Sequence, residues 1–404
     1  MIIGIIGGGA SGMAAALFAS ENPHHQVILL ERQARLGRKL MATGNGRCNL
    51  TNKNLSDKNY HGETPDFSNY ALKEFDTVQT LSWFEGMGLY TVTEDSGKVY
   101  PYSDQANSVV DILRLNLERP NITVKTAFEV EKIKKEEAGF RVSSREESIF
   151  CHKLIVACGG LAGSKLGGTM SGYKLLGKLG HKATKLRPSL VQLKSSWKCL
   201  PGLKGVRAQC TAKITYNEQL FSSSRGEIQF TEYGFSGPVI FEVSRDVCAV
   251  PGRWCCHLDL LPDWSEDTLF SVLSQRKNTH LPVQELLTGI LHNRLGRVLT
   301  QEASISLNGL CKDLTDGQLK NVCYVVKHLS AELTEPMGMD SAQVTAGGVL
   351  TEQFSPKTME SLLVPGLYAC GEVLDIDGDC GGYNLQWAWS SGRLAGISAG
   401  KESK

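Results

Sequence analysis

The segment IIGIIGGGASG, residues 2–12, identifies the fold class. Its first five residues, Ile2 to Ile6, have the length and β-branched content of a short buried strand, and three glycines follow at once. A small-residue helix is expected over Ser11 to Ser20, and a second buried strand over Val27 to Leu30. Strand, glycine turn, helix and strand together predict a βαβ unit, which is the beginning of an α/β fold with a parallel sheet.

The turn matches G-x-G-x-x-G, with glycine at positions 7, 9 and 12. Gly7 permits the tight turn, Gly9 lets the backbone approach a pyrophosphate, and Gly12 allows the helix to pack closely on the strand. The helix N-terminus adds free N–H donors and a partial positive charge. Glu31 closes the second strand, where its carboxylate can accept both ribose hydroxyls and disfavours a 2′-phosphate. We therefore predict a dinucleotide site; the alternative is a glycine turn in an unrelated α/β fold.

A second signal is GRKLMATGNGRCNLTN, residues 37–52. Two basic residues are followed by glycines and small polar residues, so the segment can cover a pyrophosphate and run beside a planar ring without filling its space. The alternative is an exposed loop with solvated charges.

The third signal is GEVLDIDGDCGGYNLQ, residues 371–386, followed by a helix that is expected to begin near Asn384. Gly381 and Gly382 let the backbone reach a ligand. A reduced flavin is negative near N1 and O2, so a helix N-terminus there favours the reduced form by about 0.3–2 kcal/mol. Glu372 is expected to bind a ribityl hydroxyl; a solvent-facing turn carboxylate is the alternative.

Composition limits the class of partner. The 404 residues carry 43 Lys and Arg against 42 Asp and Glu, so no strong field favours nucleic acid or an anionic membrane. Twelve cysteines occur without C-x-x-C pairs or histidines at zinc spacing, which predicts reduced thiols and no metal site. No apolar run approaches the ~20 residues that span a bilayer. The N-terminus has no basic leader, and a cytoplasmic location is expected.

The middle of the chain has a different texture. Half-buried strands are expected at Gln209 to Tyr216, Ile228 to Thr231 and Arg253 to Leu260, and helices at Ser265 to Gln275, Pro282 to Leu299 and Asp316 to Leu333. After this region the sequence again has the glycine-rich α/β pattern of the N-terminal part. We predict a discontinuous nucleotide-binding domain over residues 1–190 and 338–404, interrupted by a β insertion over 191–262 and a helical insertion over 263–337.

The chain resembles the BaiN/YhiN-like bacterial flavoproteins, also described as aminoacetone-oxidase-family FAD-binding enzymes. The resemblance rests on residues 37–52, on TAGGV at 345–349 and on GLYACGEVLDIDGDCGGYNLQ at 366–386. It implies an α/β fold whose Rossmann-like FAD-binding domain is built from both chain ends, with inserted β-barrel-like and helical subdomains. More distantly, the C-terminal pattern is similar to fumarate-reductase and ketosteroid-dehydrogenase flavoproteins, which act on carbon–carbon double bonds beside a carbonyl.

Three functions stay open from the sequence. In the first, FAD is recharged by NAD(P)H as a diffusible donor and reduces a conjugated ketone; the resemblance implies a steroid-like enone such as a 3-oxo-Δ4 or Δ4,6 bile acid intermediate. In the second, FAD oxidises a small amine such as aminoacetone and passes electrons to oxygen. In the third, the β insertion of an RNA- or protein-binding flavoprotein is the working surface, through Lys194, Lys198, Lys204, Arg207 and Lys213. A small-molecule substrate is favoured over nucleic acid, and the oligomeric state is undetermined.

The candidate site residues follow from these motifs. Side chains that can polarise an enone oxygen or donate a proton beside the flavin are Arg47, Tyr383 and Tyr173, with a packed aromatic or a pyrophosphate-binding arginine as the alternative. His61, His181 and His257 have no partner spacing and are expected to be structural. The residues expected to bind FAD are Gly7, Gly9, Ala10, Ser11, Gly12, Glu31, Arg32, Arg38, Lys39, Thr43, Gly44, Gly46, Arg47, Cys48, Asn49, Val130, Gly159, Gly160, Gly371, Glu372, Gly382, Tyr383, Asn384 and Leu385.

Overall fold

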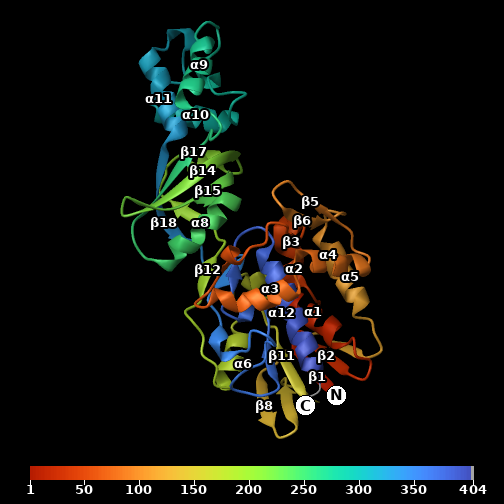
Figure 1. The fold of residues 1–404 in the computed structure, drawn as a ribbon. Coiled ribbons are helices and arrows are strands. Elements are labelled where there is room, and N and C mark those ends of the chain that lie inside the picture. Colours follow the sequence, from red (N-terminus) through yellow and green to blue (C-terminus); the bar gives the residue numbers. More distant parts are fainter. Residues whose placement is uncertain (402–404) are drawn as a thin grey trace. The chain divides into compact units, whose positions relative to one another are not determined.

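The computed structural model describes residues 1–401, which divide into two compact units (Figure 1). Unit 1 combines Met1–Pro188 with the chain from Ala342 onward, and unit 2 is the continuous segment Ser189–Ser341. Both ends of the chain therefore build one unit, and the middle of the chain builds the other.

Unit 1 is centred on a five-stranded parallel sheet in the order β20-β11-β1-β2-β7. The expected strands at the N-terminus form, and the central strand lies between the two neighbours with which it pairs. The edge strand Ile122–Lys125 ends where the chain turns back toward the end of β2. The strands are β1 (Ile2–Ile6), β2 (Gln26–Leu30), β7 (Ile122–Lys125), β11 (Lys153–Val156) and β20 (Leu367–Ala369).

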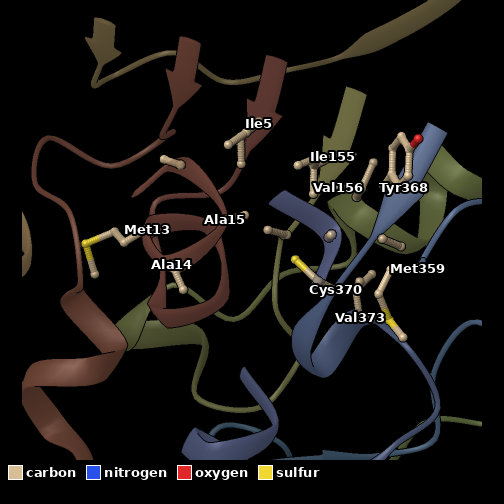
Figure 2. Packing of buried hydrophobic residues seen from close by; sticks show 14 of the residues in the cluster. Ile5, Met13, Ala14, Ala15, Ile155, Val156, Met359, Tyr368, Cys370 and Val373 are labelled. Atoms are coloured by element: carbon tan, nitrogen blue, oxygen red, sulfur yellow. The ribbon is translucent and has the colours of Figure 1, made fainter. Parts of the chain in front are cut away.

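Two helices from opposite ends of the chain lie side by side in unit 1 (Figure 1). They are α1 (Ala10–Ala19) and α12 (Tyr383–Gly400). A Cβ on Gly392 or Gly396 would lie 2.4 Å from a backbone oxygen of α1, so glycine is required for this approach. Figure 2 shows the adjoining core, in which Met13 and Ala14 of α1 are buried together with Ile155 of β11 and Tyr368 of β20.

Smaller elements surround this core. The helices are α2 (Arg38–Ala42), α3 (Ser68–Glu74), α4 (Thr77–Gly86), α5 (Ala106–Asn116) and α6 (Ser171–Lys178). The small sheets are β3 (Thr51–Asn52) with β6 (Lys98–Pro101) and β5 (Thr91–Thr93); β8 (Lys132–Glu136) with β9 (Gly139–Ser143) and β10 (Ser148–Cys151); β4 (Tyr60–His61) with β21 (Asp377–Gly378); and β12 (Arg187–Ser189) with β19 (Val344–Ala346).

Unit 2 contains a closed antiparallel barrel in the order β13-β16-β15-β14-β17-β18. Closure leaves no free sheet edge, and alternate side chains of each strand fill the interior. The expected barrel-like insertion is confirmed. Its strands are β13 (Leu193–Ser195), β14 (Arg207–Tyr216), β15 (Gln219–Phe230), β16 (Gly234–Ser236), β17 (Trp254–Asp259) and β18 (Leu329–Pro336).

Helices of unit 2 share one hydrophobic core with the barrel. They are α7 (Leu200–Leu203), α8 (Pro238–Ala249), α9 (Glu266–Arg276), α10 (Asn293–Glu302) and α11 (Asp316–Lys327).

Two helix predictions in unit 2 were wrong. The segment from Pro282 to Leu299 is not one helix but a 3-10 turn at Val283–Glu285 followed by α10, because Gly289 takes a φ of 83° and interrupts it. The helix expected to run to Leu333 ends at Lys327. Side chains of β18 alternate between buried and exposed, which is the period of a barrel strand rather than of a helix.

No helix among residues 1–401 is both long and apolar enough to cross a membrane. Within the same part of the chain, no group of three or more His, Cys, Asp or Glu side chains could hold a metal ion. None of the twelve cysteines, all of which lie among residues 1–401, forms a disulfide.

Candidate functional site

The glycine turn between β1 and α1 is shaped by backbone contacts. Gly7 has a φ of 112°, and its N–H donates to the carbonyl of Leu30 at 2.8 Å. A Cβ on Gly12 would lie 1.8 Å from the carbonyl oxygen of Gly7. Gly9, the N-cap of α1, has no atom of the described chain within 4 Å of the place where its Cβ would be. The turn thus leaves open space directly over the free N–H groups of α1, which fits a phosphate.

Glu31 follows directly after β2 and is already held in place. Its carboxylate accepts hydrogen bonds from the backbone N–H groups of Gly8 and Gln33, each at 2.7 Å. Its carbonyl accepts from Phe128 at 2.9 Å, which brings the segment containing buried Val130 to the same edge of the sheet. A carboxylate has further lone pairs, so this arrangement is compatible with the predicted ribose contact.

Glu372 joins three segments that are far apart in the sequence. The ammonium of Lys39 lies 2.8 Å from Glu372 Oε2 and 3.1 Å from Oε1, and the N–H of Thr345 donates to Oε1 at 2.8 Å. A Cβ on Gly160 would lie 2.5 Å from the same carboxylate. Sequence reasoning singled out Lys39, Gly160 and Glu372 separately, and the structure brings all three together.

Thr345 is a site residue that sequence reasoning missed, although the TAGGV string contains it. Its hydroxyl oxygen accepts hydrogen bonds from the backbone N–H groups of Leu161 and Ala162, both at 2.9 Å. It thereby fixes the loop after β11, in which Gly159 has a φ of 68° and open space beside it. Nothing in the local spacing marks this role, because its partners lie more than 180 residues away.

The segment that follows α2 packs against the C-terminal glycine pair. Gly44 and Gly46 have φ values of 56° and 85°, and no described atom lies near the Cβ position of Gly46. Asn49 is buried, and a Cβ on Gly382 would lie 2.8 Å from its Oδ1. Burial raises the pKa of the Cys48 thiol to about 12, so Cys48 is a neutral packing residue in this segment.

Other predicted residues in this region fill structural contacts. The Thr43 hydroxyl donates to the carbonyl of Leu40 at 2.7 Å. Arg32 donates to the carbonyl of Gly167 and Arg38 to the side chain of Gln33, each at 2.9 Å.

The loop before α12 is organised by a side chain. The Asn384 amide donates to the carbonyl of Gly378 at 2.7 Å, and its Oδ1 accepts from the Gly378 N–H at 2.9 Å. Helix α12 begins at Tyr383, with Gly382 as its N-cap at a φ of 102°, so its start is one residue earlier than expected. Leu385 in the first turn packs against the core of unit 1.

The three predicted catalytic side chains are engaged with other groups. Arg47 pairs with Asp104 at 2.5 Å and with Glu94 at 3.0 Å, and it lies 3.9 Å above the ring of Tyr100. Tyr173 is buried with its hydroxyl 3.5 Å from the carbonyl of Glu372, and burial raises its pKa. Tyr383 is buried, and its carbonyl accepts from the Tyr60 hydroxyl at 3.0 Å.

Histidines differ in their surroundings. His181 is buried between Ser361 Oγ and the ring of Phe354, and burial lowers its pKa. His257 contacts Thr215 within the barrel, and burial lowers its pKa as well. His61, by contrast, forms a pair with Asp379 at 2.6 Å, a partner 318 residues away that no spacing rule could reveal.

Known proteins resemble this chain along almost its whole length. The model of the HI0933-like protein Rossmann domain matches residues 1–398. A "3-dehydro-bile acid delta(4,6)-reductase" of Clostridium scindens is 39% identical, with 98% of both chains covered. A "Ribosomal RNA dihydrouridine synthase" of Escherichia coli is 31% identical, covering 96% of this chain and 95% of its own. The solved 3-ketosteroid delta1-dehydrogenase of Sterolibacterium denitrificans covers 98% of this chain and 99% of its own at 12% identity and a TM-score of 0.49.

These matches confirm the resemblance carried by residues 37–52, 345–349 and 366–386. Because the family model spans residues 1–398 and a relative is 39% identical across nearly all of both chains, the protein belongs to the HI0933-like family.

Proposed function

We propose that this protein is an FAD-dependent oxidoreductase that uses NAD(P)H to reduce a carbon–carbon double bond conjugated to a ketone in a steroid-like substrate. The observation that carries the proposal is the convergence of the two chain ends. The open space beside Gly9 at the start of α1 and the Lys39–Glu372–Thr345 cluster belong to one unit. Gly159, in the loop that Thr345 fixes, also has an open Cβ position. The name of the 39% identical relative, a bile acid reductase, supports the substrate class.

The protein's own part in this chemistry is binding and electrostatics, and bound FAD would supply the hydride transfer. Backbone N–H groups of α1 would hold the pyrophosphate, and Glu31 would receive the adenosine ribose. Glu372 would take a ribityl hydroxyl while Lys39 keeps the carboxylate oriented. The N-terminus of α12 would stabilise negative charge on the reduced ring. Arg38, Gly44, Gly159 and Gly371 remain proposed contacts.

The electron donor is proposed to bind transiently. The sequence contains one complete G-x-G-x-x-G fingerprint, which the adenosine half of FAD would occupy. NADH or NADPH would therefore reduce the flavin and leave before the substrate enters.

Anaerobic stopped-flow absorbance tests the proposal. NADH or NADPH is expected to bleach the flavin within seconds, and a 3-oxo-Δ4 or Δ4,6 steroid acid is expected to restore the colour. Saturated 3-oxo steroids serve as the matched control because they lack the double bond. Bleaching by aminoacetone, with peroxide released in air, would instead identify an amine oxidase and reject the reductase.

A second candidate function has the same chemistry, reduction of a carbon–carbon double bond beside a carbonyl, but a different substrate. The C5=C6 bond of uracil is also conjugated to a carbonyl, and the 31% identical relative carries the name of a ribosomal RNA dihydrouridine synthase. Unit 2 has 15 Lys and Arg against 16 Asp and Glu, so it offers no basic field. Three of the basic residues proposed for RNA are paired with carboxylates, namely Lys194 with Glu335, Lys204 with Glu232 and Arg207 with Glu227. These charges favour the small molecule.

The two candidates are separated by offering each substrate in turn to the reduced enzyme. Reduced enzyme is mixed with a bile acid enone or with a uridine-containing ribosomal RNA fragment, and reoxidation of the flavin is followed. Reoxidation by the RNA alone, with affinity that falls steeply as salt rises, would select the RNA substrate.

A further inference from the structure

His61 and Asp379 form a side-chain pair that the proposed function does not yet use. Their atoms Nε2 and Oδ1 lie 2.6 Å apart, although the residues are separated by 318 positions. Antiparallel strands β4 and β21 place them together, with Tyr60 opposite Gly378 and His61 opposite Asp377. The pair is therefore a product of the same convergence of chain ends that builds the proposed flavin site.

Asp379 is held from more than one direction, which fixes the orientation of the imidazole. The Asn59 amide donates to its Oδ2 at 3.0 Å, while its own N–H donates to the carbonyl of Asn59 at 2.9 Å. With both carboxylate oxygens engaged, Oδ1 remains directed at His61. A carboxylate in this position holds the ring in one orientation.

The second ring nitrogen of His61 is available. Among residues 1–401 no hydrogen-bond partner is found for Nδ1, and the side chain is 30% exposed. The imidazole can thus exchange protons with solvent and present one to a bound molecule. It is the side chain that serves most often as a general acid in enzymes.

The pair adjoins the start of α12. Asp379 lies three residues before Gly382, the N-cap of this helix. Between them, the carbonyl of Gly381 accepts from the Asn52 amide at 2.9 Å, which joins this loop to the segment after α2. The other acid candidates are less available, since Arg47 is paired with two carboxylates and Tyr173 is buried.

We propose that His61 is the acid that completes the reduction and that Asp379 is its positioning residue; this rests on the proposed function. The β carbon of the substrate would accept a hydride, which is the chemistry that bound FAD would supply, and the electrons of the double bond would move to form an enolate. The imidazolium would then give its Nδ1 proton to the α carbon, which yields the saturated ketone and neutral His61. A solvent proton would restore the acid.

The experiment separates the two half-reactions in wild type, His61→Gln and Asp379→Asn. FAD content and the rate of bleaching by NADH are expected to stay within about twofold of wild type, because the acid has no part in flavin reduction. Reoxidation by the enone is expected to slow about 100-fold or more in His61→Gln, which is the usual contribution of a general acid. Asp379→Asn should slow the same step about tenfold, with kcat reduced and KM little changed. His257→Gln, on barrel strand β17, is the matched control.

Chemical rescue distinguishes an acid from a packing residue. In His61→Gly, added imidazole is expected to restore enone reduction in proportion to its concentration, whereas acetamide should not. The inference is overturned if wild type reduces the enone and His61→Gln does so within about threefold, or if the variants lose FAD and imidazole restores nothing. Failure of wild type to reduce any enone would instead reject the proposed function itself.

Discussion

Two glycine turns in unit 1 look alike in sequence and are built differently. In the turn at residues 7–12, the close contacts are between backbone atoms, such as the Cβ position of Gly12 against the carbonyl of Gly7. In the turn at residues 378–384, side chains hold the backbone, with Asn384 binding both polar groups of Gly378 and Asn52 binding the carbonyl of Gly381. The tightest contacts of the first turn are therefore between backbone atoms, whereas the second turn is held by side-chain hydrogen bonds, one of them from a segment more than 300 residues away.

This difference predicts how each turn fails. Substitutions in the first turn should be severely destabilising, because an added side chain would clash with backbone atoms that cannot move aside. Substitutions around the second should act through lost hydrogen bonds and be graded, because each bond contributes separately.

The largest effect is expected for Gly12→Val. Its Cβ would lie 1.8 Å from the carbonyl oxygen of Gly7, so α1 cannot keep its place against β1. We expect purified protein without flavin absorbance near 450 nm and with a lost or greatly lowered thermal transition. Gly177→Ala in α6 is the control, since its Cβ position is open and alanine favours helix by about 0.5–1 kcal/mol. Normal flavin content in Gly12→Val would contradict the steric account.

Gly9→Ala tests the same turn at a position where a side chain would not clash with the protein. Its Cβ would meet no described atom, so the free protein should fold with an unchanged melting temperature. The methyl group would nevertheless occupy the space predicted for the pyrophosphate. Calorimetric titration with FAD is expected to show an affinity at least about tenfold weaker, which corresponds to about 1.4 kcal/mol. Equal affinity would show that the phosphate lies elsewhere.

Thr345→Val should produce an intermediate effect. It leaves the N–H groups of Leu161 and Ala162 without their acceptor, at a cost of about 1–3 kcal/mol for each buried group. Urea unfolding should therefore show a clear loss of stability, and FAD should bind more weakly. Thr345→Ser keeps the hydroxyl oxygen and is expected to retain most of the stability and most of the FAD affinity. If Thr345→Val is as stable as Thr345→Ser, the hydroxyl oxygen does not hold this loop.

Asn384→Ala tests the second turn directly. Loss of its hydrogen bonds to Gly378 should destabilise the folded loop by about 1–3 kcal/mol of free energy. We expect weaker FAD binding and a faster oxidation of the reduced flavin by oxygen, measured by stopped flow. Asn384→Asp keeps the acceptor for the Gly378 N–H and loses the donor, so its effect should be smaller than that of alanine.

The smallest effect concerns Cys48, in the segment that packs on the second turn. Because burial raises its pKa to about 12, only about one molecule in ten thousand carries the reactive thiolate at pH 8. Iodoacetamide at pH 8 should leave Cys48 unmodified in the folded protein and modify it in urea, as mass spectrometry of peptides would show. Rapid modification of the native protein would mean that this segment opens.

The sequence was sufficient for features whose cause is local. Spacing alone predicts the roles of Gly7, Gly12 and Glu31. Continuous apolar runs predict the strands β1, β2 and β11. Features made by long-range contacts could not be predicted, and these include Thr345 as an acceptor for the loop after β11 and Asp379 as the partner of His61. Strand β18 was taken for helix because α11 leads into it with only His328 between them. The alternation of buried and exposed side chains, which distinguishes the strand from a helix, is visible only in the structure.

The pairing of α1 with α12 has a consequence for biosynthesis. While the ribosome is making unit 2, the parallel sheet lacks its edge strand β20, and α1 lacks the helix that covers it. Unit 2 is continuous, so all six barrel strands have emerged before β20 is translated. The nascent N-terminal half therefore keeps apolar surface uncovered until the last segment is translated, which exposes it to aggregation during synthesis.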